Sequence, residues 1–104
     1  DEELLKRAME IVEKHIDDSD FTTDEFAREM LMSRSNLHLK MKALTGQSTN
    51  DFIRKMRLNK ACKLLKEGRY TVSEISAMVG FNTPSYFSTT FKKYFNCLPT
   101  EYGK

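Results

Sequence analysis

Hydrophobic residues recur along this chain at helical spacing, and short polar stretches separate the segments that carry them. The first segment has one apolar face, formed by Leu5, Ala8, Met9, Val12 and Ile16. The acidic run DDSD at 17–20 is expected to end that helix. A longer segment, 49–67, has an apolar stripe of Phe52, Ile53, Leu58, Ala61, Cys62 and Leu65. At 1.5 Å per residue it forms a helix roughly 28 Å long, closed by Gly68.

One pattern occurs on both sides of this long helix. Thr22 and Glu25 form an S/T-x-x-E capping box flanked by a hydrophobic staple pair, and Thr71 and Glu74 repeat it 49 residues later. In each copy a short helix is expected, ending near Met30 or Gly80. A second helix follows, over 33–46 in the first copy and from the Thr83–Pro84 pair in the second. The chain therefore contains two copies of a short helix, a tight turn and a second helix, joined by a long helix.

The second helix of the first copy has two different faces. Leu37, Met41 and Leu44 form its apolar stripe. The opposite face combines hydrogen-bonding groups, positive charge and one apolar side chain, and it comprises Arg34, Ser35, His38, Lys42 and Leu39. Such a helix-turn-helix unit can place its second helix in the DNA major groove, about 12 Å wide. A plain helical bundle contains the same local geometry. The duplication favours DNA, because the long helix would separate two reading helices by nearly the 34 Å that separates successive grooves.

Charge is divided unequally along the chain. The net charge is only +2, but residues 1–33 carry 11 acidic and 4 basic side chains, whereas residues 34–104 carry 4 acidic and 13 basic ones. The balances are therefore −7 and +9, which gives the molecule a preferred side for a polyanion.

Other functional classes find little support in the sequence. There is no phosphate-binding glycine loop and no local catalytic motif, so no enzyme and no catalytic residue is predicted. His15, His38, Cys62 and Cys97 lack the paired spacing of a zinc site, so neither a metal nor a cofactor is expected. The two cysteines are interpreted as free buried thiols in a reducing compartment. No signal peptide or membrane span is apparent, and a cytoplasmic location is expected.

Several motifs in this order resemble the DNA-binding domain of AraC/XylS-family bacterial transcription regulators, over essentially the whole chain. They are FTTDEFA, MSRSNLHLKMKALTGQSTNDFIRKMRLNKACKLL, TVSEISAMVGF and SYFSTTFKKYFNCLPTEY. The central motif is similar to the C-terminal domain of hybrid two-component regulators, in which a sensor kinase, a receiver and a DNA-binding domain share one chain. The acidic start at Asp1 fits a segment of a longer protein. The resemblance implies upstream phosphorylation that regulates binding to promoters of carbohydrate-utilisation genes.

The resemblance also implies which residues read bases. They are Ser35, His38 and Leu39 in the first recognition helix and Ser85, Ser88 and Thr89 in the second, and the helix face described above adds Arg34. The family often has arginine, the usual reader of guanine, at positions 39 and 89. We therefore expect weaker or more A·T-tolerant readout here. Leu31 and Asn96 replace glycines of the family, and a positive φ at Leu31 would be strained.

A second set of residues is predicted to contact the DNA backbone. Lys42, Lys92 and Lys93 flank the recognition surfaces. Ser48 and Thr49 open the long helix, where free N–H groups favour a phosphate. Basic side chains along that helix, Arg57 among them, are expected to be divided between phosphate and solvent. His15 is expected to be an ordinary surface residue.

The sequence thus predicts an all-α fold of about seven helices that forms a single DNA-binding domain over 1–104. Its parts are a first helix-turn-helix subdomain (1–47), a linker helix (48–68) and a second subdomain (69–104). The expected partners are double-stranded DNA, RNA polymerase and upstream receiver or kinase domains in the same chain, without membrane contact. The alternative is a helical protein-interaction module with little or only non-specific nucleic-acid binding.

Overall fold

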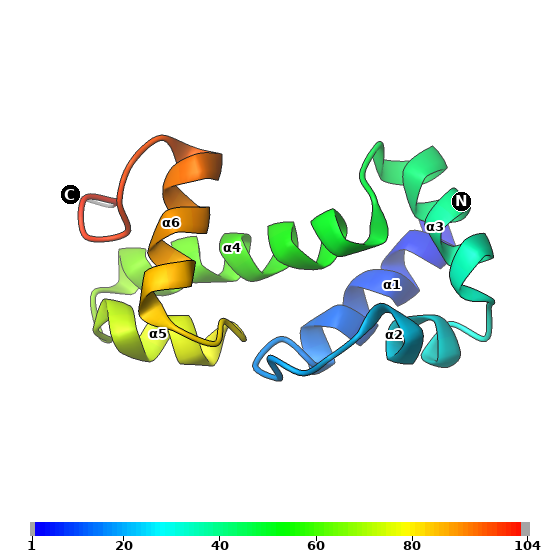
Figure 1. Cartoon of the computed structure of the whole chain (residues 1–104), viewed down its shortest axis with the longest axis horizontal. Coiled ribbons are helices and arrows are strands. Elements are labelled where there is room, and N and C mark those ends of the chain that lie inside the picture. Colours follow the sequence, from blue (N-terminus) through cyan, green and yellow to red (C-terminus); the bar gives the residue numbers. More distant parts are fainter. Residues whose placement is uncertain (1, 103–104) are drawn as a thin grey trace. The chain divides into compact units, whose positions relative to one another are not determined.

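The computed structural model describes residues 2–102, and within that range the chain is all-α (Figure 1). Its six helices are α1 (Glu2–Lys14), α2 (Thr23–Glu29), α3 (Arg34–Thr45), α4 (Thr49–Glu67), α5 (Val72–Met78) and α6 (Pro84–Phe95). The expectation of about seven helices is corrected to six for this part of the chain. After α6, the N–H groups of Glu101 and Tyr102 bond to the carbonyls of Leu98 and Pro99, so the segment forms tight turns instead of a further helix. Asp1, Gly103 and Lys104 lie outside the described residues.

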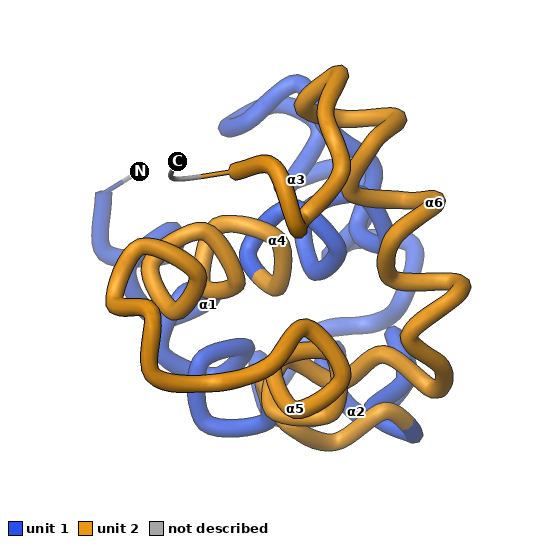
Figure 2. The backbone as a smooth tube through the Cα atoms, turned by 90° about the vertical axis from the view of Figure 1, so that its left-hand side faces the viewer, with its two compact units in different colours: residues 1–15, 20–56 blue, residues 16–19, 57–104 orange. Residues whose placement is uncertain are grey.

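The chain divides into two compact units (Figure 2). Unit 1 comprises α1, α2, α3 and the start of α4 as far as Met56. Unit 2 comprises α4 from Arg57 onward, α5, α6 and, in addition, residues 16–19. The predicted subdivision into 1–47, 48–68 and 69–104 left the long helix outside both subdomains, whereas here each unit includes part of it. The connection from α1 to α2 belongs to unit 2 even though both helices belong to unit 1.

Unit 1 has a core of side chains from all four of its helical segments. Its fully or nearly fully buried members are Ala8, Val12, Phe21, Phe26, Ala27, Met30, Leu37, Met41, Phe52 and Ile53. Met9, predicted to be buried, is 47% exposed. The buried face of α1 is centred on Ala8 and Val12, so Met9 lies at its edge. The helix ends at Lys14, where His15 N–H bonds to the carbonyls of both Ile11 and Val12. Ile16, which would have continued the face of Met9, lies beyond the helix and is buried in unit 2.

Unit 2 has its own core, to which α4, α5 and α6 contribute. It consists of Leu58, Ala61, Leu64, Ile75, Val79, Phe81, Phe87 and Phe91. The predicted apolar side of α6 is confirmed, because Phe87 and Phe91 are fully buried. Cys62 and Cys97 are free, as predicted, but only partly buried against this core. These contacts fix which side of α6 faces outward.

The turn between the two helices of each unit has the same hydrogen bonds. Met32 N–H bonds to Ala27 O in unit 1 and Phe81 N–H to Ser76 O in unit 2, each at 3.0 Å. This six-residue closure requires a left-handed residue after the first helix. Gly80 supplies it in unit 2 with φ 81°, and Leu31 supplies it in unit 1 with φ 59°. The predicted strain at Leu31 is therefore present, since a left-handed conformation disfavours a side chain with a Cβ.

The helix ends follow the signals in the sequence, with one difference. The hydroxyls of Thr22, Ser33, Thr71 and Thr83 each accept a backbone N–H three residues later, and Gly46 and Asn96 end α3 and α6 with φ 76° and 60°. The full reciprocal capping box forms only at Thr71, where the Glu74 carboxylate accepts the Thr71 N–H at 2.8 Å. At Thr22 the Glu25 carboxylate instead accepts from the hydroxyl, at 3.3 Å.

Candidate nucleic-acid interface

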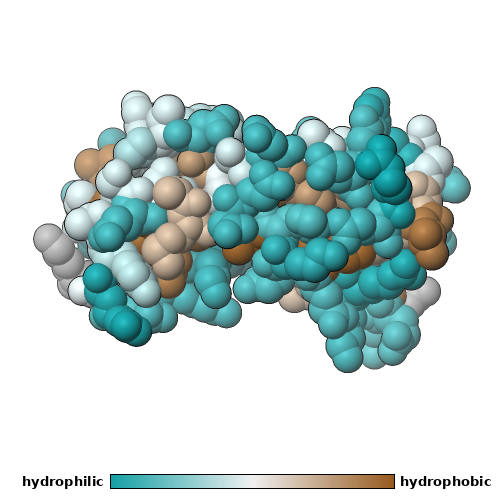
Figure 3. All heavy atoms as spheres, turned by 90° about the horizontal axis from the view of Figure 1, so that it is seen from below, coloured by the Kyte–Doolittle hydropathy of each residue, from teal (hydrophilic) through white to brown (hydrophobic). Residues whose placement is uncertain are grey.

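The polar face of α3 points outward because the opposite face is anchored. Leu37 and Met41 are fully buried, which fixes the rotation of the helix about its axis. Arg34, His38 and Lys42, spaced four residues apart, are therefore exposed together with Ser35 and Leu39. Leu39 is 65% exposed, so an isolated apolar side chain lies among polar ones on this face. On the side of the molecule seen in Figure 3, hydrophilic residues likewise cover most of the surface and hydrophobic atoms form small separate patches.

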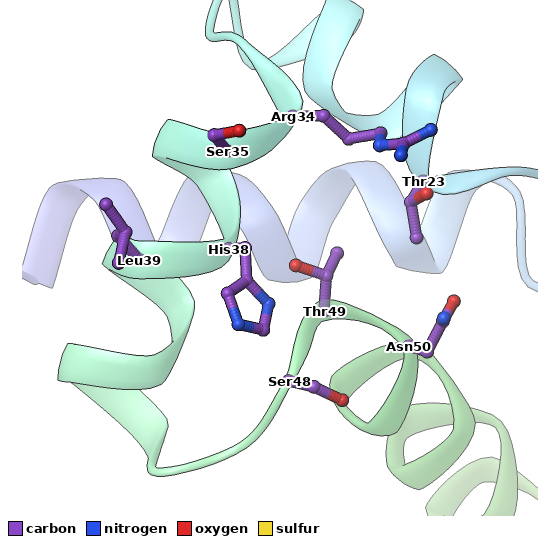
Figure 4. Close-up of a pocket in the computed structure, with 8 residues that line it drawn as sticks. All are labelled: Thr23, Arg34, Ser35, His38, Leu39, Ser48, Thr49 and Asn50. Carbon is purple, nitrogen blue, oxygen red and sulfur yellow. The ribbon is translucent and has the colours of Figure 1, made fainter.

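This face lines a hollow of about 650 Å³ that lies between α3, the start of α4 and the first residue of α2 (Figure 4). Its lining residues are Thr23, Arg34, Ser35, His38, Leu39, Ser48, Thr49 and Asn50. All of them belong to unit 1. Sequence reasoning had selected every one except Thr23 and Asn50. Both missed residues lie at helix starts, where the sequence suggested capping but gave no sign that these starts meet beside α3.

Arg34 is engaged within unit 1. Its guanidinium lies 3.1 Å from the carboxylate of Asp24 on α2, and both side chains are largely exposed. In Figure 4 the Arg34 side chain extends towards Thr23, whereas Leu39 lies at the far side of the hollow. An exposed ion pair of this kind is worth only about 0–1 kcal/mol. Arg34 can therefore exchange Asp24 for a stronger anion without a large change in stability.

Ser48 and Thr49 at the start of α4 have different roles. The Ser48 hydroxyl accepts the N–H of Asp51 at 3.2 Å, so it caps the helix. Thr49 is only 6% exposed, and its buried hydroxyl has no hydrogen-bond partner. The first N–H groups of a helix lack partners within it and carry positive partial charge. The backbone at this end of α4, more than its two side-chain hydroxyls, is thus available to an anion.

His15, predicted to be an ordinary surface residue, is instead partly buried and packed against other residues of unit 1. Its ring stacks on Phe21 at 4.3 Å with an interplanar angle of 8°, and it contacts the carboxylate of Glu29. Lys14 pairs with the same carboxylate at 2.9 Å. The hydrogen bond from Lys14, together with His15, lowers the pKa of Glu29 below its usual value of 4.5. The prediction failed because spacing alone does not reveal that Phe21 and Glu29 return to the end of α1.

The corresponding face of α6 in unit 2 carries hydroxyl and lysine side chains. Ser85, Thr89, Lys92 and Lys93 are exposed and Ser88 is partly buried. Ser85, Ser88, Thr89 and Lys92 follow the i, i+3, i+4, i+7 spacing of one helical face, opposite the buried Phe87 and Phe91. The Thr83 hydroxyl and Pro84 begin this helix, so Ser85 lies in its first turn.

Comparisons with known proteins identify relatives that share this architecture. A family model described as "Helix-turn-helix domain" matches residues 26–104. The chain is 42% identical, over 98% of its length, to "Histidine kinase P4" of Formosa agariphila, and it covers 7% of that protein. A transcriptional regulator from Chromobacterium violaceum, described as an AraC-type DNA-binding domain-containing protein, superposes with a TM-score of 0.89 at 27% identity, covering 98% of this chain and 90% of that one. This chain belongs to the AraC-type family of DNA-binding domains.

A third match links this AraC-type domain to response regulators. The C-terminal domain of AraT, a response regulator from Geobacillus stearothermophilus, superposes with a TM-score of 0.87 at 33% identity, covering 96% of this chain and 83% of that one. The chain spans 28% to 36% of the length of curated transcriptional regulators such as RhaS and SirC. The AraC-type domain is thus a DNA-binding part of transcription regulators, including regulators of the two-component type.

Two kinds of feature are absent from the part of the AraC-type domain that the structure describes. Across residues 2–102, no group of three or more His, Cys, Asp or Glu side chains is arranged to hold a metal ion. None of the helices in this range combines the length and the apolar composition that crossing a membrane requires.

Proposed function

We propose that the domain binds specific double-stranded DNA sequences by inserting α3 and α6 into successive major grooves. The observation that carries this proposal is the repeat of one helix-turn-helix unit, with matching turns and with an exposed polar face on the second helix of each copy. α4 contributes to both units, and its 19 residues make it roughly 28 Å long. That length is close to the 34 Å between successive grooves on one side of DNA.

In the first unit, base contacts are assigned to Ser35, His38 and Leu39, with Arg34 joining them once it leaves Asp24. Ser35 and His38 offer hydrogen-bonding groups to base edges, and Leu39 offers an apolar surface that suits a thymine methyl group. In the second unit, Ser85, Ser88 and Thr89 take the same role with hydroxyl groups. Neither set includes an arginine at position 39 or 89, so we expect readout that tolerates A·T pairs.

Backbone contacts are assigned around these faces. Lys42, Lys92 and Lys93 supply positive charge for phosphates beside the grooves. At the start of α4, the N–H groups of residues 49 and 50 supply the contact, because the Ser48 hydroxyl is used as a cap and the Thr49 hydroxyl is buried.

We further propose that this domain acts at the end of a longer bacterial regulator. The relative with 42% identity is a histidine kinase of which the domain corresponds to only 7%. On that basis upstream kinase or receiver domains in the same chain control DNA binding by phosphorylation, in the cytoplasm. In the full regulator, contact with RNA polymerase would convert promoter binding into a change in transcription.

The deciding experiment is to select duplexes from a random library and measure their affinity against salt concentration. A specific reader gives a negative salt slope and also a preference of about 10³-fold or more for the selected duplex over a random one. A salt slope without that preference would mean non-specific binding. No affinity even at low salt would favour the protein-interaction module.

Variants on each recognition helix test the assigned residues. We expect His38→Ala and Thr89→Ala each to reduce specific affinity about tenfold, because a base contact is worth about 1–3 kcal/mol. Asn36→Ala is the matched control, since Asn36 is exposed on α3 outside the predicted face. Equal losses for Asn36→Ala and His38→Ala would reject the assignment of that face.

A further inference from the structure

Arg57 joins three segments of unit 2. It lies on α4, and its guanidinium donates to the carbonyl of Gly80 at 2.7 Å and to the carbonyl of Asp18 at 2.8 Å. Gly80 belongs to the turn between α5 and α6, and Asp18 belongs to residues 16–19. The expectation that basic residues of this helix contact phosphate or solvent is therefore wrong for Arg57, whose charge is directed to backbone oxygens inside the unit.

The segments that Arg57 joins are in close backbone contact. Gly80 is buried, and a Cβ added to it would meet the carbonyl oxygen of Ile16 and lie 2.8 Å from Cζ of Arg57. Only glycine leaves room for residues 16–19 and the guanidinium to approach the turn together. The contact is thus specified by Gly80 and Arg57 jointly.

Holding a guanidinium at this place has a cost in solvation. Nε of Arg57 is buried without a hydrogen-bond partner, and burial lowers the pKa of the side chain, opposed by the negative charge of Asp18. A well-packed apolar side chain would avoid that cost. The arginine supplies something that an apolar residue cannot, namely two directed donors from one planar group.

The first unit shows that the turn itself does not require such a clamp. Leu31, the counterpart of Gly80, makes the same left-handed turn with the same hydrogen bonds while 83% exposed. What Arg57 adds in unit 2 is a fixed position for the turn. Only residues 81–83 separate Gly80 from α6. In this link the ring centroid of Phe81 lies 5.4 Å from that of Tyr86 and 5.2 Å from that of Phe87. A displacement of Gly80 would consequently be transmitted to the start of α6.

We propose that Arg57 is a positioning residue for the second recognition helix, acting through the Gly80 carbonyl to set the direction in which Ser85, Ser88 and Thr89 face DNA. The proposal rests on the proposed function, in that it assumes α6 reads bases.

The test compares wild type with Arg57→Met and Arg57→Lys on four duplexes. One duplex carries both selected half-sites, one has the half read by α3 scrambled, one has the half read by α6 scrambled, and one has both scrambled. Met retains the apolar stem but no donor, and Lys retains the charge but not the two-pronged geometry. Lys63→Met is the matched control, because Lys63 is exposed on the same helix in the same unit.

We expect Arg57→Met to lose at least tenfold of the discrimination at the α6 half while discrimination at the α3 half stays within twofold of wild type. For Arg57→Lys, discrimination at the α6 half should fall between the values for wild type and Arg57→Met. Lys63→Met should resemble wild type at both halves. Gly80→Ala should reproduce Arg57→Met, because its Cβ displaces the same contact.

Other outcomes overturn the proposal in distinguishable ways. If binding to all four duplexes weakens by one common factor in Arg57→Met and Arg57→Lys, so that both discriminations are unchanged, the arginine merely maintains folded protein. If both remain at the wild-type level, it does not position α6. If wild type itself fails to distinguish the four duplexes, the proposed function fails, and the role assigned to Arg57 fails with it.

Discussion

At the scale of single residues, the two interhelical turns show how one backbone conformation is met by different side chains. Leu31 and Gly80 occupy equivalent left-handed positions, with φ 59° and 81°. Leu31 extends into solvent, whereas Gly80 is buried under Arg57 and Ile16. Glycine should therefore be favoured at both turns, because of the backbone conformation alone at position 31 and because of both the conformation and the close contacts at position 80.

Leu31→Gly is expected to stabilise the domain by about 1 kcal/mol, because a left-handed conformation costs a residue with a Cβ roughly 1–2 kcal/mol. Urea unfolding monitored by circular dichroism would measure it. Leu39→Gly is the matched control, since it removes a similarly exposed side chain from the interior of a helix and should destabilise by about 1 kcal/mol. A loss of stability in Leu31→Gly would mean that the turn is not strained.

Leu39→Arg is expected to create a preference for guanine at the facing base, about tenfold or more, because arginine binds guanine through two hydrogen bonds. The measurement is a titration against duplexes that differ only at that base pair. Asn36→Arg adds the same charge on another side of α3 and should raise affinity without that preference. If wild type already prefers guanine strongly at this position, the role assigned to Leu39 is incorrect.

At the scale of helices, the sequence foretold most of the architecture because the signals were local. Caps at Ser33, Thr71 and Thr83 and left-handed ends at Gly46 and Asn96 lie where the residue types indicated. The failures involve contacts between distant segments. Met9 is exposed and His15 is stacked on Phe21, and neither result follows from the spacing of residues within α1.

The contact between α1 and α2 should make stability depend on acidity. The lowered pKa of Glu29 means that its carboxylate form stabilises the folded state, fully above the unfolded pKa near 4.5 and progressively less as the pH falls through the lowered value. We expect the stability difference between wild type and Glu29→Gln to be largest at neutral pH and to narrow below pH 4.5.

Chemical denaturation at several pH values measures that difference. Glu10→Gln, on α1 at an exposed position, is the control for removing one negative charge. A gap between wild type and Glu29→Gln that stays constant down to pH 3 would show that ionisation of Glu29 does not contribute, since protonation of the carboxylate is what removes its contribution.

At the scale of the whole molecule, the proposed function depends on the spacing of two reading helices along DNA. We expect that insertion of 5 or 10 base pairs between the selected half-sites lowers affinity to that of a duplex with one half-site, because a continuous α4 of roughly 28 Å offers no slack. Fluorescence anisotropy measures the affinities for the four duplexes, namely the original spacing, the two insertions and the duplex with one half-site. Undiminished binding after the insertion of 10 base pairs would indicate a flexible connection instead.

At this scale, features encoded by the local order of residues could be predicted from the sequence, whereas contacts between distant segments could not. The repeat, the long helix and the polar faces of α3 and α6 are visible in the order of residues, so the family and the candidate interface followed. The contributions of Thr23 and Asn50 to the hollow, and the internal role of Arg57, depend on how segments far apart in sequence meet. The spacing of hydrophobic residues does not predict contacts between such distant segments.

The placement of residues 16–19 in unit 2 has a consequence for anyone who dissects or recombines these regulators. A fragment that starts at Arg57 would contain α5 and α6 but would lack the Asp18 carbonyl and the Ile16 backbone that cover the Gly80 turn. If two relatives were recombined at a single point inside α4, unit 2 would come from one protein while residues 16–19 would come from the other. A chimera that takes unit 2 intact from a donor must therefore carry two separate pieces of the donor gene, the codons for 16–19 and those from 57 onward.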